Sequence, residues 1–429
     1  MREMKDSGIE WIGNIPATWE RCKIKNVISS IGSGTTPTSS NIDYYNSEDI
    51  CWIQSGDLYK TSYISNTAVS LSAKALHLSA LQIYAAPFIV VAMYGASVGN
   101  IAISTIDACS NQACCCIKPD NNNDLKFMYY WLSMCKIDFL SQSIGGGQPN
   151  ISQSKIRNQF YYRPQLSEQK VIANFLDSKC SEIDAISADI QKEIEILEQY
   201  KRSVITEAVT KGLNPDVKMK NSGMAWCRQI PAHWEPIPSK YLFHNSDTRK
   251  YPNDELLTAS QKYGVISQTD YMLRENASVV MANKGIENWK HIEPNDFVIS
   301  LRSFQGGLEM SEITGCVTWH YVVLKASKQL YPRYFKWLFK SSKYINALQS
   351  TCNFIRDGQD LRFSNFAKVP LFEPPYSEQV KISNYLDNKV TSIEYALADK
   401  KKQLEVLDSY KKSLIYEYVT GKKEVPNEQ

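Results

Sequence analysis

Amide side chains beside glycines are the residues in this sequence best suited to forming paired hydrogen bonds with a ligand. Gln148 and Asn150 directly follow three glycines, Gly145–Gly147. A side-chain amide presents a donor and an acceptor together, which matches the major-groove edge of adenine, and glycine permits close approach of the backbone. A flexible surface loop would have the same composition, so the pattern leaves base recognition and an ordinary loop both open.

Hydroxyl and aromatic side chains at two other turns could also contact a nucleic acid. Ser33, Thr35 and Thr36 lie among glycines and could bind phosphates, although a turn with capping hydroxyls explains them equally well. Tyr94 and Ser97 follow an apolar run that we expect to form a strand, and an ordinary strand exit is the alternative. Both turns are therefore candidates, each with a purely structural explanation.

The second half of the chain has two further glycine-flanked groups. The candidates for base contacts there are Arg302, Ser303, Gln305, Arg356 and Gln359. Arginine can pair with guanine and glutamine with adenine, but in the second group an ion pair between Arg356 and Asp357 is the alternative. Trp319 and His320 begin an apolar run, which favours a packed core tryptophan and a hydrogen-bonded histidine over a stacking platform.

Motifs for catalysis or cofactor binding are incomplete. Glu373–Tyr376 is similar to the tail of the Asp/Asn-Pro-Pro-Tyr motif of adenine methyltransferases, but it begins with Glu and no glycine-rich cofactor loop precedes it, so a linker is favoured. Gly145–Gly147 lacks the Gly-Lys-Ser/Thr of a phosphate loop, and the 5 histidines have no metal-binding spacing. We therefore expect no catalytic residue, cofactor or metal in this chain.

The segments expected to position these residues occur as an internal repeat in the sequence. Met4–Glu20 reads MKDSGIEWIGNIPATWE, and Met219–Glu235 reads MKNSGMAWCRQIPAHWE. Further on, SEQKVIANFLD from Ser167 matches SEQVKISNYLD from Ser377, 210 residues later. The segments between these shared ends have few matched residues. The pattern predicts a duplicated frame that carries two different specificities.

Two long helices are predicted, one in each copy, over residues 166–211 and 376–423. From Ile183 to Ala208 the apolar residues recur every three or four positions, and the second copy does the same except at Lys400. Ser167 and Ser377 are expected as N-caps and Gly421 as a C-terminal stop. A helix of this length extends ~65 Å and needs a partner for its apolar stripe. We expect the two helices to pair antiparallel; the alternative is that each packs on its own domain.

The fold class expected is mixed α/β (α+β), with two globular domains of residues 1–165 and 212–375 separated by the two helices, and a tail of residues 424–429. The chain has 429 residues and 43% apolar residues, enough for several cores. Its 11 cysteines form no CxxC pair and are expected to be reduced and mostly buried, as in a cytoplasmic protein. Residues 212–376 have 20 basic and 15 acidic side chains, a net charge of +5, while residues 1–166 have 13 and 12, a net charge of +1.

Several short motifs together resemble the specificity subunits of type I restriction-modification systems. The resemblance covers almost the whole chain and is carried by Gly-Ile-Glu-Trp at 8–11, Ile-Pro-x-x-Trp-Glu at 15–20, Gly-Ser-Gly-Thr-Thr-Pro at 32–37, Gly-x-x-x-Gly-x-Ile at 95–101, Asn-Gln at 111–112 and Pro-x-x-Ser-Glu-Gln before each long helix. The second copy departs from this pattern at Met224, Ala225, Cys227 and Arg228 and lacks the Gly-Thr-Pro signature.

The resemblance implies a non-catalytic subunit that reads double-stranded DNA with one domain for each half of an interrupted, asymmetric target. It also implies two methyltransferase subunits and two restriction and translocase subunits as partners, with S-adenosylmethionine, ATP and Mg²⁺ bound by the partners. Two alternatives remain open from the residues alone. One is a self-contained adenine-N6 DNA methyltransferase, and the other is a free-standing duplicated DNA-binding regulator or scaffold.

Overall fold

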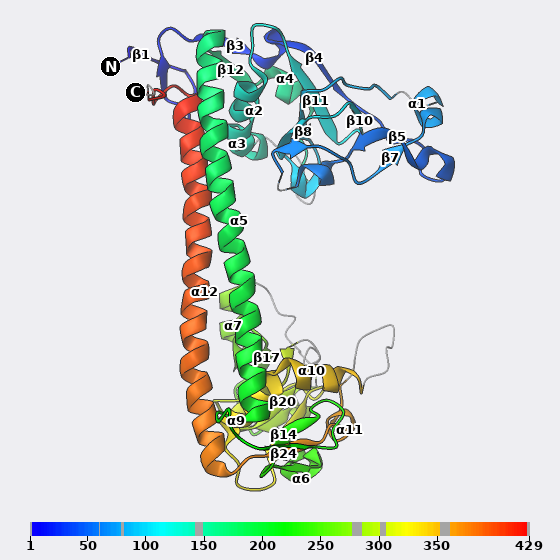
Figure 1. Cartoon of the computed structure of the whole chain (residues 1–429), viewed down its shortest axis with the longest axis vertical. Coiled ribbons are helices and arrows are strands. Elements are labelled where there is room, and N and C mark those ends of the chain that lie inside the picture. The colour runs from blue at the N-terminus through cyan, green and yellow to red at the C-terminus, as the bar shows by residue number, and fades with distance from the viewer. Residues whose placement is uncertain are drawn as a thin grey trace. The chain divides into compact units, whose positions relative to one another are not determined.

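The computed structural model describes residues 2–59, 61–78, 81–141, 149–276, 285–300, 306–351 and 361–426. The chain divides into two compact units, which we call unit 1 (Met1–Ile190 with Gln403–Gln429) and unit 2 (Gln191–Lys402). Both ends of the described chain lie in unit 1, where Arg2 Nε is 3.5 Å from Glu424 Oε1 (Figure 1). Among the described residues, no helix is long and apolar enough to cross a membrane.

Unit 1 is built on a five-stranded sheet with the order β4-β11-β8-β9-β6, and a second sheet has the order β10-β5-β7. Its strands are β1 (Met4–Asp6), β2 (Asn14–Pro16), β3 (Glu20–Lys23), β4 (Ile28–Ser33), β5 (Tyr45–Ile53), β6 (Tyr63–Ile64), β7 (Ser70–Leu71), β8 (Phe88–Ala92), β9 (Ile101–Ser104), β10 (Ala108–Ser110), β11 (Cys114–Pro119) and β12 (Phe160–Arg163). Its short α-helices are α1 (Ala73–Leu78), α2 (Leu125–Met134), α3 (Lys136–Ser141) and α4 (Gln153–Asn158).

The core of unit 1 lies on both faces of the five-stranded sheet. Val91 of β8 packs in one cluster with Phe127 and Trp131 of α2, while Val90 packs in a second cluster with Phe88. Because both faces of β8 are covered, its sequence is a continuous apolar run instead of an alternating pattern. The expectation of a mixed helix and strand fold is confirmed.

Unit 2 has a four-stranded sheet with the order β16-β23-β20-β21. Its strands are β13 (Met219–Asn221), β14 (Gln229–Pro231), β15 (Glu235–Ile237), β16 (Phe243–Ser246), β17 (Leu257–Ser260), β18 (Gly264–Ser267), β19 (Lys290–Ile292), β20 (Phe297–Ile299), β21 (Glu309–Met310), β22 (Gly315–Val317), β23 (Val322–Ala326) and β24 (Leu371–Glu373). Its short α-helices are α6 (Ser239–Leu242), α7 (Gln268–Glu275), α9 (Pro332–Lys340), α10 (Ser342–Gln349) and α11 (Phe363–Phe366).

The duplication predicted from the sequence is present in the strand pairing. The β1–β2 ladder aligns Met4 with Pro16, and the β13–β14 ladder aligns Met219 with Pro231 at the same register. The β3–β12 pair of unit 1 has its counterpart in the β15–β24 pair of unit 2. In each unit a central strand, β11 or β23, lies between two antiparallel neighbours. The boundaries expected for two recognition domains, 1–165 and 212–375, remain predictions.

The two long helices are α5 (Leu166–Lys211) and α12 (Tyr376–Val419). The first has the predicted bounds, but the second ends four residues before the predicted position 423, since Gly421 adopts a left-handed φ of 67°. The predicted N-caps at Ser167 and Ser377 are wrong, because both serines are already inside the helices, which begin at Leu166 and Tyr376. The carbonyls of Gln165 and Pro375 accept the first helical bonds, each at 3.0 Å.

Antiparallel pairing of the helices is confirmed within each unit. In unit 1 the rings of Phe175 and Tyr418 are 4.5 Å apart, and Lys411 Nζ is 2.6 Å from Asp184 Oδ1. In unit 2 Lys400 Nζ is 2.5 Å from Glu193 Oε2, and Lys201 pairs with Glu394 at the same distance. The residue number on α12 falls as the number on α5 rises, so the helices run in opposite directions in both units.

Candidate nucleic-acid interface

In each unit, the N-terminal Trp motif contacts the motif that begins the long helix. Trp19 and Trp234 are buried, and their indole Nε1 atoms donate to Glu168 Oε1 at 3.3 Å and to Glu378 Oε2 at 2.9 Å. Arg2 forms an ion pair with the first carboxylate. The Ile-Pro-x-x-Trp motif and the Ser-Glu-Gln motif therefore have one structural purpose, which is to join the start of each long helix to its unit.

A buried glutamine in each copy fixes the start of a shorter helix that precedes it in the chain. Gln169 Oε1 accepts from the backbone N–H of Asp124 at 2.8 Å, and Gln379 Oε1 accepts from that of Tyr331 at 2.9 Å. Asp124 and Tyr331 are the N-caps of α2 and α9, respectively. Gln379 also donates to the Pro374 carbonyl at 2.8 Å. The Glu373–Tyr376 segment therefore joins β24 to α12, in agreement with its interpretation as a linker.

One end of the five-stranded sheet in unit 1 collects the candidate residues of the first half. Because β4 and β8 both run antiparallel to β11, their C-terminal ends lie beside the N-terminal end of β11. We call this place the sheet end of unit 1. The candidate residues that end these two strands, follow them or lie opposite them are Ser33, Thr35, Thr36, Tyr94, Ser97 and Asn150.

The contacts at this sheet end distinguish exposed side chains from those that shape a turn. Tyr94, 44% exposed, lies opposite the exposed Asn150 in an antiparallel bridge. Ser97 Oγ instead donates to the Tyr94 carbonyl at 3.1 Å and stabilises the turn. The Thr36 hydroxyl donates to the amide oxygen of Gln112, an exposed residue just before β11. Gln112 was absent from the predicted site, although its Asn-Gln motif was the available signal.

The glycines beside Ser33 have a packing role. A Cβ at Gly34 would overlap the backbone carbonyl of Ser110, and one at Gly32 would overlap the Tyr84 hydroxyl. Ser33 itself belongs to β4 and pairs with Cys115. The close approach that glycine permits here is made by Ser110 of β10 and by the Tyr84 side chain, both in unit 1. Contact of Ser33, Thr35 and Thr36 with phosphate remains a prediction.

Half of the predicted contact residues lie outside the residues that the structure describes. They are Gln148, Arg302, Ser303, Gln305, Arg356 and Gln359.

The sheet end of unit 2 corrects one prediction. It is formed by the C-terminal ends of β16 and β20 and the residues before β23. Trp319 lies there with 54% of its surface exposed, so its assignment to the core is wrong. The cause is a turn that separates β22 from β23, in which the backbone N–H of Tyr321 donates to the Thr318 carbonyl at 3.0 Å.

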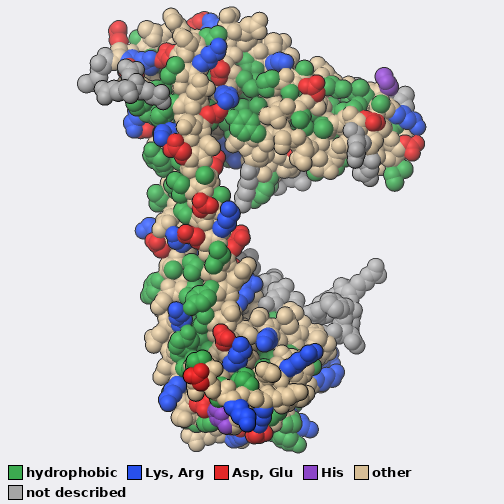
Figure 2. Space-filling view, in the orientation of Figure 1, with side chains coloured by type: hydrophobic (Ala, Val, Ile, Leu, Met, Phe, Trp, Pro, Cys, Tyr) green, Lys and Arg blue, Asp and Glu red, His purple; other side chains and the backbone are tan. Residues whose placement is uncertain are grey.

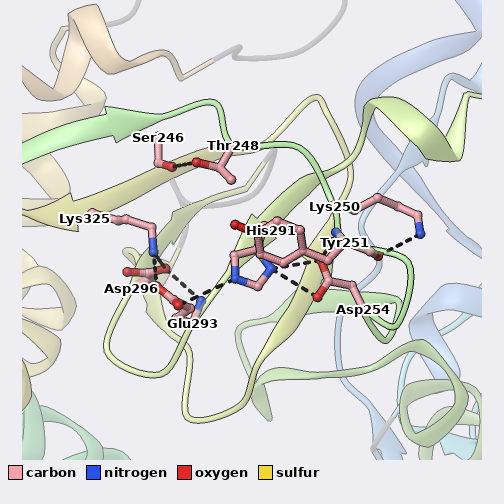
Figure 3. Close-up of polar contacts among 9 residues, drawn as sticks. All are labelled: Ser246, Thr248, Lys250, Tyr251, Asp254, His291, Glu293, Asp296 and Lys325. Carbon is pink, nitrogen blue, oxygen red and sulfur yellow. Dashed lines mark hydrogen bonds and ion pairs between the residues drawn. The ribbon is translucent and has the colours of Figure 1, made fainter.

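A buried histidine network lies next to this sheet end (Figure 3). His291 Nδ1 is 2.9 Å from Asp254 Oδ2, and the Tyr251 ring packs 4.3 Å from the histidine ring. Asp254 Oδ2 also accepts from the backbone N–H of Tyr251 at 2.7 Å, and the backbone N–H of His291 donates to the Thr248 carbonyl at 2.8 Å. Sequence reasoning missed this network, because its members are separated by about 40 positions. It fixes the segment 246–254 against β19.

The carboxylates at the other side of this network share one lysine. Lys325 Nζ is 2.5 Å from Glu293 Oε2 and 2.9 Å from Asp296 Oδ2. The hydrogen bond from Lys325 lowers the pKa of Glu293, whereas burial raises the pKa of Asp296 despite the same ion pair. Across the described ranges, no group of three or more His, Cys, Asp or Glu side chains is arranged to hold a metal ion.

Comparisons with known proteins agree with this geometry. Residues 16–196 match the family model described as the type I restriction modification DNA specificity domain. Two relatives from Methanocaldococcus jannaschii are similar. The MjaX specificity subunit is 24% identical over 64% of this chain and 62% of its own length, and the MjaIX specificity subunit is 29% identical over 44% and 43%. The matched region thus spans about three fifths of the first relative.

The fold is also that of a solved structure. One chain comes from a structure described as the basis of complex assembly and conformational transition of the type I R-M system. The alignment covers 95% of this chain and 99% of the solved chain. The TM-score is 0.68 and the identity is 12%, so the likeness concerns the fold alone. The family model and the curated relatives together show that this chain is similar to type I restriction-modification specificity subunits.

Proposed function

We propose that this chain is the non-catalytic DNA-recognition subunit of a type I restriction-modification complex and reads an asymmetric, interrupted target, one half-site with each globular region. One observation carries this proposal. The frame residues Trp19, Glu168 and Gln169 recur as Trp234, Glu378 and Gln379 with the same contacts, whereas the residues at the two sheet ends differ. A repeated frame with unlike sheet ends suits two readers of different half-sites.

The long helices supply the surface on which partner subunits would dock. An exposed apolar pair, Ile196 and Tyr200 on α5, recurs 210 residues later as Val406 and Tyr410 on α12. These side chains are 44–63% exposed, and apolar side chains are visible along both long helices in Figure 2. Each unit has one such pair, which supports two equivalent sites for two methyltransferase subunits. S-adenosylmethionine, ATP and Mg²⁺ would be bound by the partner subunits.

Disrupting one apolar pair should remove one partner. In the double variant Ile196→Glu and Tyr200→Glu, buried carboxylates would weaken the contact by about 2 kcal/mol or more, roughly 30-fold in affinity. We expect a complex with one methyltransferase subunit where the original chain binds two, as measured by native mass spectrometry.

Leu273→Glu is a matched control, because Leu273 is an exposed apolar residue of α7 and is not part of either long helix. It should leave two partners bound. Retention of both partners by the double variant would rule out this docking surface.

Methyl transfer tests the proposed function against its enzyme alternative. The purified chain should not transfer a methyl group from S-adenosylmethionine to DNA, and should direct that transfer to one target sequence once the methyltransferase subunits are added. Methylation by the chain alone would contradict the proposal. A chain that binds its target fully without partners, and does not redirect them, would favour the regulator alternative.

A further inference from the structure

The residues before the central sheet strand differ in chemistry between the two units. Cys115 of β11 pairs with Ser33 and Val91, and Val323 of β23 pairs with Ser246 and Val298. Counting back from these matched positions places Trp319–His320 where unit 1 has Asn111–Gln112. Both pairs precede the central strand at its sheet end. The two pairs therefore occupy equivalent positions, and the amide pair of unit 1 is replaced by an aromatic pair in unit 2.

The aromatic pair is exposed and preorganised. Both side chains are exposed, and their rings stack with centroids 3.5 Å apart and planes inclined by 29°. An exposed tryptophan that is already ordered by stacking loses little conformational freedom when it binds a ligand. Tryptophan also offers the largest apolar face of any side chain together with one N–H donor. This pair has the properties of a contact surface and contributes little to the core of unit 2.

Strand pairing places two basic residues close in the fold to this pair. Lys290 of β19 pairs in the ladder with Val317, two residues before Trp319, and Arg249 forms an isolated bridge with Lys290. Arg249 also contacts the Asn288 amide, and Lys290 Nζ is 2.9 Å from Asp247 Oδ1. The buried network of Figure 3 holds the segment that carries Arg249 in place. The aromatic pair of this sheet end and the two cations of the neighbouring β19 segment together have a composition that suits duplex DNA.

We infer that the stacked Trp319 and His320 pair is the base-contacting element of unit 2, with Arg249 and Lys290 contacting the adjacent phosphates. This inference rests on the proposed function and names the residues that determine one half-site. The tryptophan face would contact a thymine methyl group or the apolar edge of a base step, and the histidine would form a hydrogen bond with a base edge. Unit 1 would read its own half-site through Gln112, so the two halves are read by different chemistry.

Binding of the assembled complex to a panel of duplexes tests the inference. In the panel each base pair of the target is changed in turn, and affinities are measured by fluorescence anisotropy at one fixed salt concentration. Trp319→Ala should weaken binding to the intact target roughly 10- to 100-fold. It should also abolish discrimination at positions of one half-site only. His320→Ala should relax the same half-site, whereas Gln112→Ala should relax the other.

Two variants separate this effect from misfolding. Trp319→Phe keeps an aromatic face and should retain most of the affinity. Tyr241→Ala removes an exposed aromatic residue from α6, which leads into the opposite end of the same sheet, and should change nothing. Because Trp319 is exposed, Trp319→Ala should melt at the temperature of the original chain.

The outcomes also separate this inference from the proposed function. Unchanged half-site discrimination in both Trp319→Ala and His320→Ala, in a complex whose original form discriminates, would overturn the inference alone. Equal loss of discrimination in both half-sites would overturn it too. An original complex that shows no preference for any duplex would instead overturn the proposed function.

Discussion

Replacing Trp19 by alanine should unfold most of unit 1 at temperatures at which the original chain is stable. The indole is 1% exposed, packs edge-on against Phe127 with ring centroids 6.1 Å apart, and donates to Glu168. Truncating a buried tryptophan costs about 3–5 kcal/mol, a large part of the stability of an ordinary domain. The glycine after α12 also lies against this ring, so the same change loosens the end of the second long helix.

Thermal unfolding followed by circular dichroism measures this effect, and Trp11 provides a matched control. Trp11 belongs to the same N-terminal motif but is 38% exposed, so Trp11→Ala should leave the unfolding temperature almost unchanged. Trp234→Ala should lower the stability of unit 2 as Trp19→Ala lowers that of unit 1. If Trp19→Ala and Trp11→Ala had equal effects, the structural role assigned to the repeated Trp and Glu pair would be wrong.

Replacing Asp177 by alanine should have the second largest effect. Its carboxylate accepts from the Tyr130 hydroxyl at 2.7 Å and from the Tyr63 hydroxyl at 3.2 Å, and it forms an ion pair with Lys126. Tyr63 lies in β6, at the edge of the five-stranded sheet, so this one side chain of α5 fixes both that edge and α2. Removing an acceptor from several donors should lower the free energy of unfolding by about 3 kcal/mol, as measured by urea denaturation.

The same variant should change a tyrosine titration. Burial and the Asp177 carboxylate raise the pKa of Tyr63 to about 12. A phenol with a higher pKa in the folded than in the unfolded chain stabilises the fold in its neutral form. This contribution is complete below a pH of about 10 and is lost as the pH rises through about 12. In Asp177→Ala the pKa of Tyr63 should fall, which a difference between ultraviolet titration curves would record.

Glu182→Ala is the control for Asp177→Ala, because Glu182 is also on α5 but has exposed contacts, an ion pair with Lys179 at 2.9 Å and a hydrogen bond from Ser178 at 3.4 Å. Its unfolding midpoint should equal that of the original chain. A midpoint for Asp177→Ala that matches this control would contradict the role given to the carboxylate.

The long helices could be predicted from the sequence because an apolar stripe is a local pattern. Ile183, Ile190 and Ile194 are buried, as their spacing indicated, but Ile186 in the same stripe is half exposed. One antiparallel partner covers only part of a helix circumference, which a stripe alone does not reveal. Lys400, which interrupted the second stripe, pairs with Glu193 on α5. The interruption thus reflects the partner helix.

The site could be predicted less completely because it depends on pairing between distant strands. Residues of β4 and β8 meet at one sheet end only because β11 lies between them, and no local pattern encodes that order. Trp319 was misassigned because its run of apolar neighbours suggested a strand, while the turn at 318–321 exposes it. The histidine network involves residues 254 and 291, whose contact follows from tertiary packing.

The most direct test of the claim that each globular region reads one half-site is a map of methylated adenines. The map is made in cells that express the chain with its partner subunits. The original chain should give one interrupted motif, with an adenine methylated in each half. A chimera in which residues 1–165 come from another specificity subunit should change one half of that motif and leave the other intact. An uninterrupted motif, or a chimera that changes both halves or neither, would contradict the account.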